Sequence, residues 1–271
     1  MKSNASTLTP EAGGRLTETS HAVKPFNDDV HGAAGYTLGS ITPAELATLR
    51  EHIREQWLYR LQLVVPEHVS KFSAIPMDQY HTISDLVDHA RIWPKTSRVL
   101  PASAVRSVRS MSFFKRLESE FGEILIGDEE NFGWENITWR LVRPHQKDVG
   151  PVHADEWFWE VRPTQKKHAG YIPIKIGMAV YCDAGRNGLR LVEGSHRKTD
   201  VYKYRTEMRN DLPVPVYDGA EEDLPMTVPK TNPGDFIIFN HFVLHAGVWN
   251  NENTTRVSID FTIFVPERHK K

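Results

Sequence analysis

The sequence predicts a mainly β protein with helices in its N-terminal half, and three observations support this fold class. Between about residues 43 and 121, apolar side chains recur at three- and four-residue steps, the period of a helix with one buried face. From about Asn136, apolar and polar residues alternate over short runs separated by glycine, proline and asparagine turns. Strands and helices do not alternate there, so we expect an antiparallel barrel or sandwich with helices packed on one side.

The helices are predicted from capping residues and from the apolar period. Thr42 can cap a helix and Glu45 stands where a capping box needs a carboxylate, so a first helix is expected over 43–63. A short helix is expected near 84–92 and a third helix over about 102–121. The buried face of the first helix would contain Leu46, Leu49, Ile53, Trp57 and Leu61.

Seven strand-like runs and a single domain are expected. The runs are 138–143, 152–158, 172–182, 189–192, 235–239, 243–249 and 256–265. Residues 1–35 are polar and small and bury too little surface to offset the entropy of ordering, so we expect a flexible tail or a loosely docked arm. No repeat or linker interrupts the rest, which predicts one domain over 36–271, with helical support over 36–135 and a β core over 136–265.

Composition favours a protein that acts on small molecules inside the cell. The formal charge of −2 gives no bulk attraction for nucleic acid or an anionic membrane. The single cysteine, Cys182, forms no disulfide within the chain and excludes a cysteine-rich zinc module. The first twenty residues lack the apolar segment of a signal peptide, so we expect a cytoplasmic location. The oligomeric state is not predicted.

His153 and Asp155 are candidate metal ligands because residues i and i+2 of a strand project to the same side. A histidine plus a carboxylate suits non-haem iron(II) when a second histidine completes the set. About two such pairs are expected by chance from 13 histidines and 35 acidic residues among 271 positions, so a surface histidine near an aspartate is the competing interpretation. The motif therefore needs a second histidine from elsewhere in the chain.

His241 and His245 are the candidates for that second histidine, and a predicted hairpin favours His245. A tight turn centred on Asn250 and Asn251 would place His245 opposite Arg256, with both side chains on one face. An odd-length loop would shift this register by one residue.

The last predicted strand has a polar face that indicates a ligand cavity. Its alternate residues Arg256, Ser258, Asp260 and Thr262 share one side, and a polar barrel interior is unusual for a packed core. A buried arginine is costly unless it meets an anion, and its planar fork fits a carboxylate. The residues thus predict a metal with a carboxylate ligand bound beside it.

The chain resembles the iron(II)- and 2-oxoglutarate-dependent dioxygenases, in particular the phytanoyl-CoA dioxygenase-like family, over about residues 36–265. The segments that carry this resemblance are His153-x-Asp155, His245, Arg256-x-Ser258, the Gly-Ser-His segment within 187–197, and 234–239. The resemblance implies a double-stranded β-helix, a jelly-roll barrel of the cupin type, with helices before it. It also implies iron(II) on His153, Asp155 and His245, with 2-oxoglutarate paired to Arg256 and Ser258 and consumed with O₂.

The implied activity is oxidation of a C–H bond, with release of succinate and CO₂. Two departures from the family pattern bear on it: Glu193 replaces the usual proline before Gly-Ser-His, and that segment is one residue short. Asp155 is not the glycine or alanine of halogenating members, which favours hydroxylation. Alternatives are desaturation, cyclisation or epimerisation by the same cofactors, or a cupin-like metal-binding protein without oxygenase activity. The expected substrate is a small or carrier-linked polar metabolite.

Further site residues are predicted with a competing interpretation for each. Trp157 and Trp159 share the parity of the metal ligands and would face the substrate, unless they pack in the core or in a lid. Lys175 would admit 2-oxoglutarate or an anionic substrate, unless it protects an edge strand. Arg190, like Arg140 and Arg143, would bind an acidic group, unless it is solvated surface. His145, His168, His196 and His241 are expected to be structural or to support the ligands.

Overall fold

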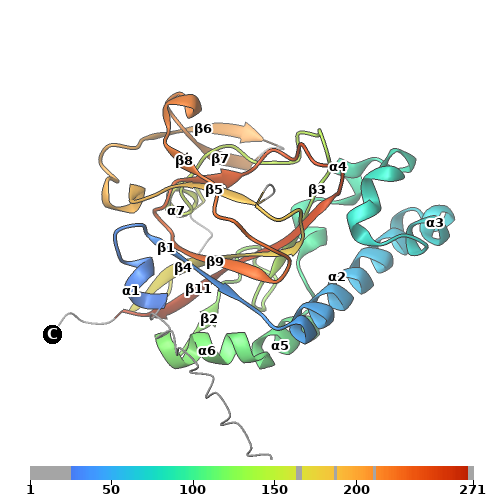
Figure 1. Cartoon of the computed structure of the whole chain (residues 1–271), viewed down its shortest axis with the longest axis horizontal. Helices are drawn as coiled ribbons and strands as arrows, with labels where there is room; N and C mark the ends of the chain where they lie inside the picture. Colours follow the sequence, from blue (N-terminus) through green and yellow to red (C-terminus); the bar gives the residue numbers. More distant parts are fainter. Residues whose placement is uncertain (1–25, 163–166, 186–187, 210–211, 268–271) are drawn as a thin grey trace, which may run out of the picture.

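The computed structural model describes residues 26–162, 167–185, 188–209 and 212–267 (Figure 1). Within these ranges most strands pair antiparallel in two facing sheets, and the long N-terminal helices lie on one side of the larger sheet. This is the predicted mainly β jelly-roll fold with N-terminal helices. No helix among the described residues is long and apolar enough to cross a membrane.

The first long helix forms where the capping residues predicted it. Helix α2 spans Pro43–Val64; the Thr42 side chain accepts from the Glu45 N–H, and Glu45 accepts from the Thr42 N–H. This reciprocal pair satisfies two backbone donors that the first helical turn leaves free. The shorter helical elements of this half are α1 (Phe26–Val30), η1 (Pro66–His68), α3 (Val69–Ser73), η2 (Met77–Thr82), η3 (Ser84–Leu86), α4 (His89–Ile92) and η4 (Lys95–Arg98).

The third predicted helix is two helices, α5 (Ala102–Ser110) and α6 (Ser112–Phe121). The chain is extended at Met111, with φ −67° and ψ 152°. Beyond the break, Glu45 of α2 accepts hydrogen bonds from the Ser112 N–H and hydroxyl. A carboxylate at a helix N-terminus meets free N–H donors and the positive end of the dipole, so the break is stabilised by a residue distant in sequence.

The larger sheet has the strand order β1-β9-β4-β11-β2, and β3 also pairs with β11. At its centre are two long strands, β4 (Tyr171–Tyr181) and β11 (Arg256–Pro266), with β9 (Asp235–Asn240) on the other side of β4. The outer strands are β1 (Tyr36–Ser40), β2 (Leu125–Ile126) and β3 (Thr138–Val142). Lys175 lies on β4, which is paired on both sides, so the prediction that it protects an edge strand is wrong.

The smaller sheet has the order β10-β5-β8, and a separate hairpin lies beside it (Figure 1). Its strands are β5 (Leu189–Val192), β8 (Met226–Thr227) and β10 (His245–Gly247), with η5 (Ser195–Arg197) and η6 (Glu221–Asp223) between them. The hairpin joins β6 (Tyr204–Arg209) to β7 (Leu212–Tyr217). Strands β1, β2, β6, β7 and β8 were not among the predicted runs.

The predicted pairing of His245 with Arg256 is wrong. His245 is opposite Leu191 of the smaller sheet, whereas Arg256 is opposite Val142 of the larger sheet. The chain between them passes from one sheet to the other, so the asparagine turn does not close a hairpin between those strands.

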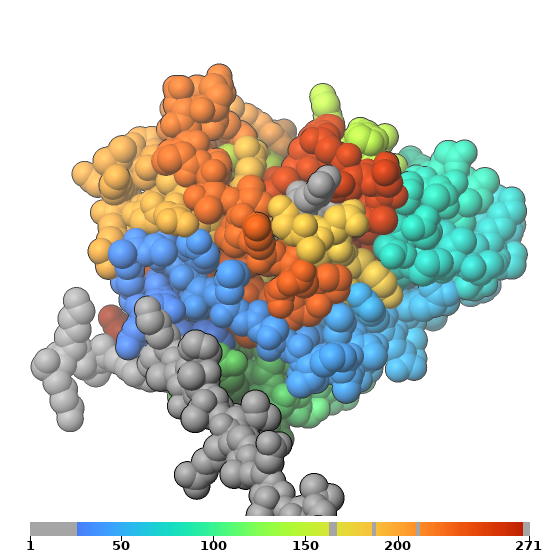
Figure 2. Space-filling view, in the orientation of Figure 1, coloured from blue at the N-terminus to red at the C-terminus, as the bar shows by residue number. Residues whose placement is uncertain are grey.

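Part of the predicted flexible arm is packed against the domain. Phe26 and Val30 of α1 are 2% and 0% exposed, and β1 pairs with β9 over its whole length. Figure 2 shows this N-terminal segment, in blue, in contact with the orange segments of the C-terminal half. The described part of the arm, residues 26–35, is therefore docked on the domain through Phe26 and Val30. Residues 1–25 lie outside the described ranges.

Candidate metal centre and cosubstrate cavity

His153 and His245 are held side by side by the backbone. Each residue's N–H donates to the other's carbonyl, at 3.0 Å and 2.9 Å, as an isolated antiparallel bridge. Directly opposed residues of an antiparallel pair project to the same face. The two rings are therefore neighbours, with centroids 4.4 Å apart.

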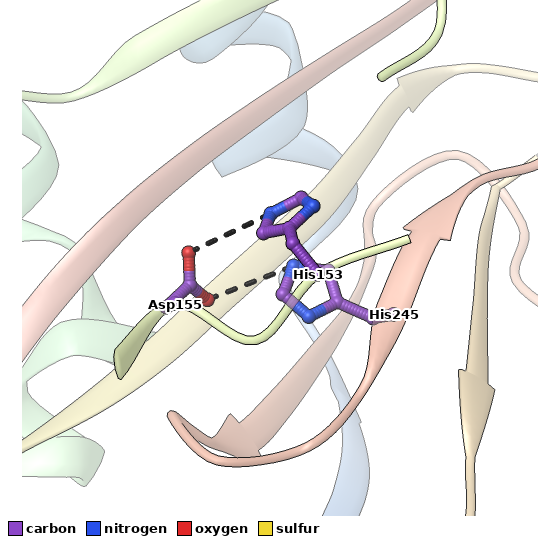
Figure 3. Close-up of side chains that lie close together, drawn as sticks. All are labelled: His153, Asp155 and His245. Carbon is purple, nitrogen blue, oxygen red and sulfur yellow. Dashed lines mark ion pairs between the residues drawn. The ribbon is translucent and has the colours of Figure 1, made fainter. Parts of the chain in front are cut away.

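Asp155 reaches the histidines from the start of a helix. The predicted strand 152–158 ends at the bridge, and α7 (Glu156–Val161) follows, with Asp155 itself in helical conformation at φ −62° and ψ −31°. Its Oδ2 lies 3.6 Å from His245 Nε2, and its Oδ1 lies 4.0 Å from His153 Nε2 (Figure 3). Oδ2 is buried and accepts no hydrogen bond from a described residue, so it has an unused lone pair facing the histidines.

Both histidines are held in the form that binds metal. His153 Nδ1 lies 2.8 Å from the Pro151 carbonyl, and His245 Nδ1 lies 2.9 Å from the Val243 carbonyl. A carbonyl only accepts, so each Nδ1 carries the hydrogen and each Nε2 keeps its lone pair toward Asp155. Burial and the neighbouring His245 lower the pKa of His153 to about 3, and burial lowers the pKa of His245.

These three residues fit a metal ion. Their ligand atoms all lie within 4.8 Å of one another, and the described residues contain one such group. Two imidazole nitrogens and one carboxylate are the ligand set of non-haem iron(II), with positions left open for other ligands.

A cavity of about 140 Å³ lies between the two sheets, and the triad is in its wall. Strands β3, β4, β9 and β11 contribute one side of the cavity, and β5 and β10 the other. Of the polar face predicted for the last strand, Arg256, Ser258 and Asp260 line this cavity, whereas Thr262 does not and contacts Lys175 and Glu129. The charged and polar residues of the wall are Arg140, Asp148, His153, Asp155, Lys175, Thr231, His245, Arg256, Ser258 and Asp260.

Arg256 is a buried cation without a carboxylate partner among the described residues. Its Nη1 donates to the Gly188 carbonyl at 2.7 Å and the Val248 carbonyl at 3.3 Å, and its Nε has no partner. Burial and the charge of Arg140 lower the pKa of Arg256 to about 10, which leaves it charged at neutral pH. A buried guanidinium with free donors is costly until an anion pairs with it.

Lys175 lies in the cavity, where carboxylates surround its ammonium. Nζ is 2.9 Å from Glu129 Oε1, 3.7 Å from Asp260 Oδ2 and 3.9 Å from Asp155 Oδ1. Burial opposes the charged form, but these carboxylates raise the pKa of Lys175. Burial also opposes ionisation of Glu129, yet Lys175 and Lys95 lower its pKa to about 2. Lys175 is thus held beside the triad by Glu129, a residue that the sequence analysis did not select.

Arg140 and Asp260 form a two-point ion pair in the same wall. Arg140 Nε and Nη2 donate to the two carboxylate oxygens at 2.6 Å and 3.1 Å. Burial opposes ionisation of Asp260, but Arg140 and Lys175 hold its pKa well below the usual range. The sequence placed Asp260 on the polar face but could not identify its partner, because Arg140 is 120 residues away.

Three predicted substrate residues do not line this cavity. Trp157 is buried and stacks on Tyr204 with ring centroids 5.0 Å apart, and Trp159 contacts His241 and Phe264. Their shared parity with Asp155 would hold only in a strand, and the chain is helical there.

Arg190 is likewise engaged away from the cavity. Its Nη2 pairs with Glu221 Oε2 at 2.7 Å, and Glu221 also accepts from the Val152 N–H. The arginine therefore ties β5 to the chain that leads into His153.

Comparisons with known proteins agree with this geometry. Two solved structures share the fold: EctD from S. alaskensis in its apoform (TM-score 0.51, 13% identity, 88% of this chain and 76% of that chain) and the non-heme monooxygenase ThoJ in its apo form (TM-score 0.50, 12% identity, 86% and 75%). A comparison with curated protein sequences gives no match. The model of the family "Phytanoyl-CoA dioxygenase (PhyH)" matches residues 40–258. The chain therefore belongs to the phytanoyl-CoA dioxygenase family of iron- and 2-oxoglutarate-dependent oxygenases.

Proposed function

We propose that this dioxygenase hydroxylates a small polar metabolite, free or carrier-linked, in the cytoplasm. The observation that carries the proposal is that a metal-binding group and an anion-binding group line one cavity. The triad of His153, Asp155 and His245 directs two imidazole nitrogens and the unbonded Asp155 Oδ2 toward one point, and Arg256 is a cation without a carboxylate among the described residues. Iron(II) fits the first group, and a dicarboxylate cosubstrate such as 2-oxoglutarate fits the second.

The residues of the chain would divide the work as follows. His153, Asp155 and His245 would hold iron(II), which together with 2-oxoglutarate and O₂ supplies the oxidising chemistry. Arg256 would pair with the far carboxylate of 2-oxoglutarate, and the Ser258 hydroxyl, in the same wall, would donate to it. The apolar residues of the wall would exclude water from the reacting C–H bond.

Lys175 would position the Asp155 carboxylate. Its ammonium is already paired with Glu129 and lies 3.9 Å from the Asp155 carboxylate. This contact restrains the orientation of the Asp155 carboxylate. The role predicted from the sequence, direct contact of Lys175 with 2-oxoglutarate or an anionic substrate, would use the third hydrogen of the ammonium, since Glu129 and Thr262 accept from the other two.

Release of succinate under air tests the proposal. Protein supplied with iron(II) and 2-oxoglutarate should release succinate and CO₂, slowly without a substrate and faster with one. A product heavier by one oxygen atom supports hydroxylation, whereas loss of two hydrogens or an unchanged mass supports desaturation, cyclisation or epimerisation. Iron-bound protein that releases no succinate would leave only the non-oxygenase, metal-binding alternative.

A further inference from the structure

Arg140 and Asp148 also line a second, smaller cavity of about 80 Å³. The two cavities are neighbours because they share these residues. The second has room for several water molecules or one small oxyanion. Its wall consists of His89, Trp93, Arg98, Arg140, Leu141 and Asp148.

Two of the charged groups in this wall are neutralised by partners. Arg143 pairs with Asp148 through two hydrogen bonds of 2.9 Å, and Arg140 pairs with Asp260 in the same two-point manner. Each pair cancels its own charge, so neither contributes a net charge to the cavity.

Arg98 is the exception, because its partners are carbonyl groups. Its Nε donates to the Trp93 carbonyl at 3.1 Å and its Nη1 to the Trp139 carbonyl at 3.0 Å. It forms no ion pair with a carboxylate in the described part of the chain. Burial and the charge of Arg140 lower the pKa of Arg98 to about 10, so it stays protonated at neutral pH. A mostly buried positive charge of this kind favours the entry of an anion.

His89 adds a neutral hydrogen-bond donor. Trp93 Nε1 donates to the Tyr80 oxygen at 3.2 Å, and that hydroxyl lies 3.1 Å from His89 Nδ1. With the Tyr80 hydroxyl donating to Nδ1, Nε2 carries the histidine hydrogen. Nε2 lies 3.9 Å from Asp148 Oδ1. The pKa of His89 is lowered by burial to about 4, so the ring is neutral near pH 7.

We propose that this second cavity is an oxyanion site, in which Arg98 and His89 bind the carboxylate or phosphate group of an acidic substrate. The assignment to the substrate rests on the proposed function, since the reacting carbon would lie in the neighbouring cavity. Arg140 would form the wall between the bound acid and the metal centre. Asp148 opposes an anion, but Arg143 already occupies both of its oxygens.

Phosphate and acetate titrations of the metal-free protein, followed by calorimetry, test the site directly. Arg98→Gln should weaken binding about tenfold or more, because it removes a charged donor. Arg98→Lys keeps the charge and should lose less. The titrations are made in the Arg256→Gln background, because Arg256 is itself an unpaired cation that an anion in the main cavity would neutralise. Arg190→Gln is the matched control, since Arg190 is paired with Glu221 outside both cavities and its loss should leave binding unchanged. Circular dichroism shows whether each variant is folded.

Opposite outcomes would overturn the proposal. The second cavity would be ruled out as an anion site if neither phosphate nor acetate bound to the wild type. It would also be ruled out if binding were lost in Arg256→Gln and kept in Arg98→Gln. The tighter of the two anions identifies the group, a phosphate or a carboxylate. Neither iron nor 2-oxoglutarate is present, so this result is independent of the oxygenase assay.

The assignment to the substrate has its own test in the oxygenase assay. Phosphorylated or carboxylated compounds that accelerate succinate release by the wild type should not accelerate it in Arg98→Gln. Equal acceleration in the wild type and in Arg98→Gln would show that the oxyanion site does not bind the substrate.

Discussion

The two walls of the main cavity are built in different ways. The metal triad lies on short segments: one bridge at His153, the first residues before α7, and the three-residue β10. The charged residues of the other wall, Lys175, Arg256 and Asp260, lie on β4 and β11. These strands are eleven residues long and paired with each other along most of their length. A continuous ladder fixes side chains without a ligand, whereas short segments are more easily displaced. We call the side of the cavity formed by β4 and β11 the strand wall and the side formed by His153, Asp155 and His245 the metal wall. We therefore expect the strand wall to be ordered before any ligand binds, and the metal wall to become fully ordered only when it binds its ion.

The largest expected effect is the loss of catalysis, without loss of stability, when Asp155 is replaced. Asp155→Ala should lower succinate release by about a thousandfold or more, because a metal ligand contributes several kcal/mol to catalysis. Its Oδ2 makes no hydrogen bond among the described residues, so the metal-free variant should unfold at an unchanged or slightly higher urea concentration. Retained turnover would mean that the carboxylate is not a ligand.

In the strand wall, the largest effect should be on stability. Asp260→Ala removes the partner of Arg140 and one neighbour of Lys175, and should lower the free energy of unfolding by about 2 kcal/mol. This value lies between those for exposed and buried pairs, because the Arg140 side chain is 48% exposed and the Asp260 side chain is 16% exposed. Urea unfolding of the metal-free protein measures it. Asp218→Ala, which breaks the exposed pair with Arg205, is the control and should cost less than about 1 kcal/mol; equal costs would refute a pre-organised wall.

A smaller, selective effect is expected at Arg256. Arg256→Gln should weaken 2-oxoglutarate binding by about ten- to a hundredfold, the loss expected for charged hydrogen bonds, and leave iron affinity unchanged. Anaerobic titration of iron and then of 2-oxoglutarate measures both constants. Arg190→Gln is the matched control because Arg190 is paired with Glu221 outside the cavity. A parallel loss of iron affinity would show that the two walls are not independent.

The effect spread over the widest range of conditions is the pH dependence of stability from His89. Burial lowers its folded-state pKa from 6.5 to about 4, so the unfolded chain binds the proton more tightly. This contribution to stability is present above pH 6.5 and is lost as pH falls from 6.5 toward 4. Glu129, with a pKa lowered from 4.5 to about 2, adds a second loss below pH 4.5. Urea midpoints should fall less between pH 6.5 and 4.5 in His89→Gln; identical slopes would contradict the assignment.

The sequence predicted the strand wall better than the metal wall, for a physical reason. Alternation along β11 identifies Arg256, Ser258 and Asp260 as one face because a strand has a fixed period of two. The same rule failed at Trp157 because helical geometry begins at Asp155, and no residue before it marks that change. The pairing of Lys175 with Glu129 joins residues 46 apart, which local patterns do not encode.

The three residues of the predicted triad lie together in the structure, although not for the reason given in the sequence analysis. His245 of β10 meets His153 through an isolated backbone bridge, not through a hairpin with Arg256. Both histidines and Arg256 nevertheless line one cavity, because the two sheets face each other. The chemistry of the residue types was thus more informative than the predicted register.

The most direct test of the central claim is the visible absorption of the protein with iron(II) and 2-oxoglutarate under anaerobic conditions. If the triad holds iron and Arg256 holds the far carboxylate, a weak charge-transfer band should appear only when both are present. The band should be absent in Asp155→Ala and require more 2-oxoglutarate in Arg256→Gln. Iron-loaded wild-type protein that shows no band at saturating 2-oxoglutarate would contradict the account.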